Sequence, residues 1–230
     1  MTDKLVALVP AAGIGRRMGA DKPKQYLPLT EHCILGETLA RLLAHPAISE
    51  VVVALAAEDP YFDDLAQASH PKLRTVIGGD ERADSVLACL AAVNPDIAPW
   101  VLVHDAARPL ITAGDIDAVV KAARAGQGAI LAAPLVDTIK WSQDGKRIEE
   151  TVPRQHLWRA LTPQCFPTGA LRLALSEALA EGASITDEAS AMERLGWPVT
   201  LVKGRNDNIK ITEPADLPLA RWLLSQQESC

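Results

Sequence analysis

Residues 5–19 read LVALVPAAGIGRRMG. Five apolar residues of strand length run into a glycine-rich turn, and a helix-like segment follows the turn. Glycines allow a ligand to approach the backbone closely, so the N–H groups of such a turn can hold phosphate. This stretch therefore predicts a strand, a phosphate-binding turn and a helix, in that order.

The rest of the chain alternates in the same way. Further apolar runs of strand length begin at residues 51, 73, 100, 128 and 198. Amphipathic patterns with apolar residues three and four apart lie between them, for example at residues 83–93 and 115–124. This alternation predicts a Rossmann-like three-layer α/β fold, with helices on both faces of a mostly parallel sheet, formed by residues 1–230 as one domain.

One segment, residues 136–153, interrupts this alternation. It has strand-like ends around Asp144-Gly145, a pair typical of a tight two-residue hairpin turn. A hairpin outside the main sheet is marginally stable alone and would expose Ile139, Trp141 and Ile148. We therefore predict a β-arm that is exchanged between the subunits of a homodimer; the alternative is an arm folded onto its own domain.

Composition limits the classes of function. A chain of 230 residues with 48% apolar and 23% charged residues is typical of a globular protein, and its net charge of −6 argues against a nucleic-acid surface. No apolar run is long enough for a membrane helix and no signal peptide is evident, so we expect a cytoplasmic protein with no membrane partner. The four cysteines form no Cys-x-x-Cys pair, which indicates reduced thiols rather than zinc ligands or disulfides.

The type of phosphate turn is decided by its spacing. There is no Walker A sequence, and the third glycine lies one position too late for the dinucleotide fingerprint Gly-x-Gly-x-x-Gly. Gly13 and Gly15 are followed by Arg17 and then Lys24, and these two cations would flank a triphosphate and neutralise charge on its α-phosphorus. The combination favours nucleotidyl transfer over nicotinamide binding.

A second set of polar residues follows the apolar run at residues 100–104. Asp105 and Arg108 come at its carboxyl end, where open α/β sheets place ligand groups. Asp105 is a candidate for contact with a ribose or with the water shell of Mg²⁺. His104 is interpreted as a packed histidine at the end of the strand.

Ordered motifs extend this pattern over nearly the whole chain. After PAAGIGRRMG they are KPKQYL, GGDERADSV, VLVHDAARP, DTIK, ALTPQ, ITDEAS and GRNDNIKIT. In this order they resemble the 2-C-methyl-D-erythritol 4-phosphate cytidylyltransferases of the non-mevalonate isoprenoid pathway. The resemblance implies a nucleotidyltransferase fold. It also implies an enzyme that makes 4-diphosphocytidyl-2-C-methyl-D-erythritol and pyrophosphate from CTP and methylerythritol phosphate, with Mg²⁺ or another divalent cation.

The resemblance also implies roles for individual residues. The catalytic cations are Arg17, Lys24 and Lys210. The CTP-binding residues are Ala11, Ala12, Gly13, Gly15, Gly79, Asp80, Ser85, Asp105 and Ala106. The acceptor-binding residues are Arg108, Thr138, Arg154, Thr162 and Thr186, although Thr186 by itself also fits a helix N-cap.

Three alternatives remain open from the sequence. The nearest rival is a ribitol 5-phosphate cytidylyltransferase, which has a similar loop and fold and differs in its acceptor pocket. An NAD(P)-dependent oxidoreductase is disfavoured by the late third glycine. A nucleotide-binding module without catalysis is disfavoured because separate cationic sets serve the nucleotide and the acceptor phosphate.

Overall fold

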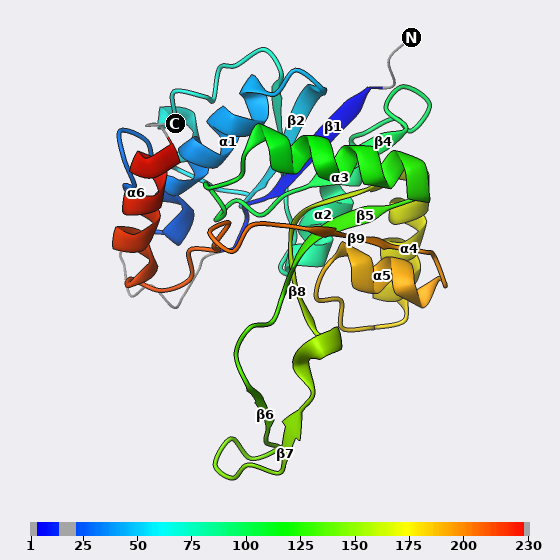
Figure 1. Cartoon of the computed structure of the whole chain (residues 1–230). Coiled ribbons are helices and arrows are strands. Elements are labelled where there is room, and N and C mark those ends of the chain that lie inside the picture. The colour runs from blue at the N-terminus through cyan, green and yellow to red at the C-terminus, as the bar shows by residue number, and fades with distance from the viewer. Residues whose placement is uncertain (1–3, 14–21, 228–230) are drawn as a thin grey trace.

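The computed structural model describes residues 4–13 and 22–227, and its centre is a seven-stranded sheet (Figure 1). The strands are β1 (Leu5–Pro10), β2 (Ile48–Leu55), β3 (Leu73–Ile77), β4 (Trp100–Val103), β5 (Ala129–Pro134), β8 (Trp158–Pro167) and β9 (Thr200–Lys203). Their order across the sheet is β3-β2-β1-β4-β8-β5-β9. Only β8 runs antiparallel to its neighbours, so the predicted mostly parallel sheet is confirmed.

Helices cover both faces of the sheet because β1 is apolar on both of its faces. Leu5, Ala7 and Val9 face a core cluster shared with α1 (Ile34–Ala44) and α3 (Ala113–Gly126). Val6 and Leu8 face the opposite cluster, which is shared with α2 (Arg82–Ala91), α4 (Thr168–Ala180) and α5 (Glu188–Arg194). A strand buried on both faces reads as a continuous apolar run, as residues 5–9 do.

The last helix, α6 (Asp216–Gln227), packs against the segment that follows the phosphate turn. Ala220 and Leu224 share a small core with Leu29, Ile34 and Leu110. This segment includes the short 3-10 turn η2 (Lys24–Tyr26). Two further 3-10 turns, η3 (Phe62–Asp64) and η4 (Arg154–His156), lie elsewhere in the chain. The contact holds residues 24–29 beside the sheet.

Strand β8 was not predicted, although it lies inside the sheet, between β4 and β5. Pro163 and Pro167 lie within it, and proline normally argues against a central strand. The ladder with β5 accommodates Pro163 in an irregularity, since Ile130 pairs with Gln164 while Ala132 pairs with Ala160. Extra residues on β8 therefore leave Pro163 outside the regular pairing.

The predicted hairpin arm is present, but its turn is different. Strands β6 (Ile139–Trp141) and β7 (Glu150–Val152) pair antiparallel, and the arm protrudes from the body of the molecule (Figure 1). Asp144-Gly145 does not close a two-residue turn, because the loop spans residues 142–149. The Asp144 carboxylate instead accepts hydrogen bonds from the N–H groups of Lys146 and Arg147, so it shapes a longer loop.

Within residues 4–13 and 22–227, no helix is both long and apolar enough to cross a membrane.

Candidate active site

Two cavities adjoin at the carboxyl ends of β1 and β4. The first, of about 290 Å³, is lined by the turn after β1, by η2 and by the residues after β4. The second, of about 200 Å³, is lined by β8 and by the residues that precede α5. Arg82, Asp105 and Lys210 line both cavities, so they form a shared wall. We call these spaces the first and second cavities.

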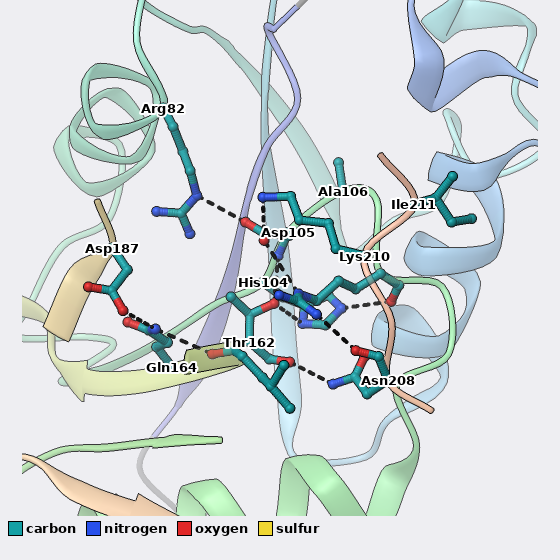
Figure 2. Close-up of polar contacts among 12 residues, drawn as sticks. Arg82, His104, Asp105, Ala106, Thr162, Gln164, Asp187, Asn208, Lys210 and Ile211 are labelled. Atoms are coloured by element: carbon teal, nitrogen blue, oxygen red, sulfur yellow. Dashed lines mark hydrogen bonds and ion pairs between the residues drawn. The ribbon is translucent and has the colours of Figure 1, made fainter. Parts of the chain in front are cut away.

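The carboxylate of Asp105 is surrounded by three cations. Arg82 Nε donates to Oδ1 at 2.9 Å, and Lys210 Nζ lies 2.9 Å from Oδ2 (Figure 2). Arg108 Nε lies 3.5 Å from the same Oδ2, an ion-pair distance. Burial by itself would raise the pKa of Asp105, but Arg82, Lys210 and Arg108 hold it well below its usual range. The shared wall therefore carries more positive than negative charge, which suits phosphate ligands.

His104 lies directly behind Asp105 and is fully buried. Burial lowers the pKa of His104 to about 4, so the ring is neutral at pH 7. Its Nε2 lies 3.0 Å from the carbonyl oxygen of Arg108, which can only accept, so the proton is on Nε2. The Thr162 hydroxyl then donates to Nδ1 at 3.1 Å and accepts from the Asp105 N–H at 3.1 Å (Figure 2). This confirms His104 as a packed residue that fixes the backbone of Asp105.

Gln25 and Lys24 shape the first cavity from the side of η2. Gln25 is buried, and its Nε2 donates to the carbonyl oxygens of Ala11 and Gly13 at 2.7 and 3.1 Å. Lys24 Nζ donates to the carbonyl oxygen of Ile211 at 3.1 Å, next in sequence to Lys210. The predicted residues Ala11, Gly13, Lys24, Asp105, Ala106 and Lys210 all line this cavity.

The predicted residues Gly79, Asp80 and Ser85 lie beside the first cavity rather than among the described residues of its lining. The buried Ser85 hydroxyl accepts from the Gly79 N–H at 3.2 Å. Next to them, a Cβ on Gly78 would lie 2.6 Å from Ala12 Cβ and 2.8 Å from Ser85 Oγ. The absence of a side chain at Gly78 therefore lets the backbone of this turn contact the turn after β1 closely.

Arg108, Thr162 and Thr186, predicted to bind the acceptor, all line the second cavity. Arg108 Nη1 donates to the carbonyl oxygen of Asn208 at 2.8 Å, and Asn208 Nδ2 donates to that of Thr162 at 2.9 Å. The N-cap of α5 is Asp187 rather than Thr186, because the Asp187 carboxylate accepts from the Ser190 N–H at 2.9 Å. The Thr186 side chain is therefore not needed to cap the helix.

Besides Gly79, Asp80 and Ser85, the predicted residues Ala12, Gly15, Arg17, Thr138 and Arg154 are not among the described residues that line these cavities. Thr138 and Arg154 are exposed on and beside the arm, and neither is among the described residues that line either cavity. Arg154 Nη1 instead donates to the carbonyl oxygen of Val136. Gly15 and Arg17 lie outside the described residues.

Several residues of the site were not predicted. They are Gln25, Arg82, Gln164, Asp187 and Asn208. Gln164 was missed because its partners are distant in the sequence. Its Nε2 donates to Asp187 at 2.9 Å (Figure 2). Its Oε1 accepts from the Ala189 N–H at 3.0 Å, so it joins β8 to α5. Gln25 and Arg82 could have been found from the sequence, because they lie inside the motifs KPKQYL and GGDERADSV.

The comparison with known proteins agrees with this geometry. The family model described as 2-C-methyl-D-erythritol 4-phosphate cytidylyltransferase matches residues 5–226. The chain belongs to this family. Its relative in Shewanella amazonensis is 58% identical over 225 residues, which cover 97% of this chain and 94% of that protein. The relative in Tolumonas auensis is 56% identical and covers 96% of this chain and 97% of its own.

Solved structures of the cytidylyltransferase family also match. The crystal structure of the Francisella tularensis enzyme aligns with a TM-score of 0.84 and 32% identity, covering 96% of this chain and 100% of that one. The Thermus thermophilus enzyme aligns with a TM-score of 0.79 and 33% identity, covering 95% and 98%. The α/β nucleotidyltransferase fold is therefore confirmed, including the mostly parallel sheet and its helices on both faces.

The divalent cation expected from the sequence would find few protein ligands in the first cavity. Asp105 is the single carboxylate among the described residues that line the first cavity, and both its oxygens are paired with cations. No cluster of three or more acidic, histidine or cysteine ligands occurs in the described part of the chain. The residues therefore fit Mg²⁺ only if CTP phosphates supply most of its ligands.

Proposed function

We propose that the first cavity binds CTP and the second binds the acceptor phosphate, so that the two substrates meet at Arg82, Asp105 and Lys210. As a member of this family, the chain transfers a cytidylyl group from CTP to 2-C-methyl-D-erythritol 4-phosphate and releases pyrophosphate. The product, 4-diphosphocytidyl-2-C-methyl-D-erythritol, is an intermediate of isoprenoid precursor biosynthesis. The observation that supports the assignment of the two cavities is their shared cationic wall.

The proposed reaction is an in-line attack of an acceptor phosphate oxygen on the α-phosphorus of CTP. This oxygen is already a nucleophile, so no general base is required, and both nitrogens of His104 are engaged in hydrogen bonds. Lys24 in the first cavity and Lys210 at the shared wall are the proposed electrostatic stabilisers, together with Arg17. Pyrophosphate leaves without a covalent enzyme intermediate.

The nucleotide and acceptor assignments complete the proposal. The turns around residues 11–13 and 78–80, held by Gln25 and Ser85, are proposed to enclose cytosine and ribose. On the acceptor side, Arg108, Thr162 and Thr186 are proposed to bind the phosphate. Mg²⁺, bound through CTP phosphates with Asp105 nearby, would withdraw charge from the α-phosphorus.

A homodimer with exchanged arms is part of the proposal. The arm leaves the body of the molecule, and Val136, Trp141 and Ile148 on it are 65%, 56% and 66% exposed, whereas Ile139, which was also expected to be exposed, is half-buried. Such apolar exposure favours contact with a second subunit. Thr138 and Arg154 would then serve the second cavity of the partner. A cytoplasmic location is proposed from the sequence, in keeping with the free thiols of Cys33, Cys89 and Cys165.

The function is tested by measuring pyrophosphate release with CTP, UTP, ATP or GTP, each offered methylerythritol phosphate or ribitol 5-phosphate. We expect release with CTP and methylerythritol phosphate at a kcat/KM at least about a hundredfold above any other pair, because unpaired polar groups of a base-reading site penalise the wrong base. Activity confined to ribitol 5-phosphate would overturn the acceptor assignment. Absence of release with every pair would favour a binding module.

A further inference from the structure

Arg82 lines both cavities and binds Asp105, but the reaction proposed above assigns it no function of its own. It is the first residue of α2, and 27% of its side chain is exposed. Its guanidinium makes three hydrogen bonds to two carboxylates that lie far apart in the sequence, Asp105 and Glu188. An arginine at the junction of two substrate cavities merits a specific explanation.

Glu188 anchors Arg82 by a two-point contact. Arg82 Nη1 donates to Glu188 Oε1 at 2.6 Å, and Nη2 donates to Oε2 at 3.0 Å. Glu188 is fully buried at the start of α5, two residues after Thr186 of the second cavity. Burial would lower the pKa of Arg82, but Glu188 and Asp105 raise it above its usual range, so the guanidinium is charged. The paired fork fixes its plane and leaves little freedom of rotation.

The remaining contact of Arg82 fixes the orientation of Asp105. Nε donates to Oδ1 at 2.9 Å, which leaves Oδ2 for Lys210 at 2.9 Å and Arg108 at 3.5 Å (Figure 2). If Oδ1 lost this partner, the carboxylate could rotate and bind Lys210 with both oxygens. The ammonium group would then be drawn toward Asp105 and away from the ligand space. Two further N–H groups of the guanidinium are not used by Glu188 or Asp105.

We infer that Arg82 is a positioning residue: held by Glu188, it orients the carboxylate of Asp105 and thereby presents Lys210 to the reacting phosphates where the two cavities meet. This inference rests on the proposed function of that site. Because α2 carries Arg82 and α5 carries Glu188, the same contact sets the nucleotide side and the acceptor side relative to each other. It concerns the alignment of bound substrates, so its loss affects turnover more than binding.

The test uses the full-length protein and the double variant Arg82→Gln/Glu188→Gln. Removing Arg82 alone would leave Glu188 as an unpaired buried charge, which is strongly destabilising, whereas two amides can pair in its place. We expect kcat to fall about ten- to a hundredfold, while KM for CTP changes by less than about threefold. Arg82→Lys keeps one charge but cannot bridge both carboxylates, so it should also lose kcat, and it serves as the second variant if the double variant does not fold.

The control is Arg74→Gln. Like Arg82, Arg74 pairs with a carboxylate: its Nε donates to Glu50 at 2.7 Å. It also donates to the carbonyl oxygen of Ala92, the residue that follows the last residue of α2. It lines neither substrate cavity, so its kinetics should match those of the wild type within twofold. Thermal unfolding of each variant is measured in parallel.

A double-mutant cycle separates positioning from a structural role. In an Asp105→Asn background, the Gln/Gln pair at positions 82 and 188 should cost less than about twofold in kcat, because its effect passes through Asp105. An equal loss in both backgrounds, or a kcat within twofold of the wild type, would overturn the inference. If the wild type itself formed no cytidylyl product in this assay, the proposed function would fail instead, so the two failures are distinguishable.

Discussion

At the residue scale, the site depends on buried polar groups whose hydrogen bonds can run in one direction only. His104 must carry its proton on Nε2 because the Arg108 carbonyl can only accept, and Thr162 then connects the ring to the Asp105 N–H. This chain of hydrogen bonds needs a neutral imidazole. Protonation of Nδ1 would leave two donors facing each other, unless the Thr162 hydroxyl turned away.

The neutral state of His104 makes folding stability depend on pH. Its pKa is about 4 in the folded protein, below the ordinary 6.5, so the unfolded chain binds more protons between these values. The free energy of unfolding should therefore fall as pH is lowered from 6.5 to 4, by up to about 3 kcal/mol from this residue. Asp105 changes the free energy of unfolding outside this window. Its pKa is lowered in the folded protein, so the folded and unfolded chains differ in protonation there only at pH values below about its ordinary 3.8.

Urea unfolding between pH 7 and 4 measures this effect against His104→Gln, which lacks the titrating ring. The wild type should be more stable than the variant at pH 7, and the difference should shrink on acidification. Parallel curves at all pH values would show that His104 does not titrate in this range. His70, a half-buried residue just before β3 whose Nδ1 accepts from the Lys72 N–H, provides a control in the variant His70→Gln.

Residue chemistry alone predicted part of this site. Asp105 and Arg108 follow an apolar strand, which is the usual position of ligand groups, and the structure places both at the cavities. Arg82 and Glu188 are 106 positions apart, and each reads as an ordinary helix-start charge in the sequence. Their pairing depends on how α2 and α5 pack on one face of the sheet, which local patterns do not specify.

At the element scale, periodicity predicted six of the seven strands and failed at β8. Runs such as residues 51–55 are apolar throughout because both faces of those strands are buried. In β8, two prolines interrupt the pattern, and an irregular ladder with β5 compensates for Pro163. That compensation belongs to the neighbouring strand, so it could not be seen in β8 itself.

The arm is the element whose proposed role is most open to experiment. Replacing Trp141 and Ile148 by lysine puts two charges on its exposed apolar surface, which should weaken the proposed dimer without affecting the core. We expect a monomer by sedimentation velocity and at least a tenfold loss of kcat/KM, because Thr138 and Arg154 would no longer reach the partner's second cavity. A fully active monomer would contradict the exchanged-arm proposal.

A matched control is available on α6. Trp222 is 59% exposed, close to the 56% of Trp141, and it belongs to α6, a helix that lies away from the arm (Figure 1). Trp222→Lys should keep both the oligomeric state and the activity of the wild type. A similar loss in this variant would indicate a general effect of surface charge rather than of the arm.

At the scale of the whole molecule, the order of strands creates the site. Because β1 and β4 are neighbours, the turn after β1 and the residues after β4 come together in the first cavity. The antiparallel β8 beside β4 brings Thr162 and Gln164 to the second cavity, and α6 holds the segment with Lys24. Two cavities that share one cationic wall are what a transfer between two phosphorylated substrates requires.

The central claim is that an oxygen of the acceptor phosphate attacks the α-phosphorus of CTP at this wall. Methylerythritol phosphate labelled with ¹⁸O in its phosphate tests it directly when the products are followed by ³¹P NMR. The account predicts unlabelled pyrophosphate and an isotope shift on both phosphorus signals of the product, because the bridging oxygen comes from the acceptor. An unshifted cytidylyl phosphorus, or label in the pyrophosphate, would contradict it.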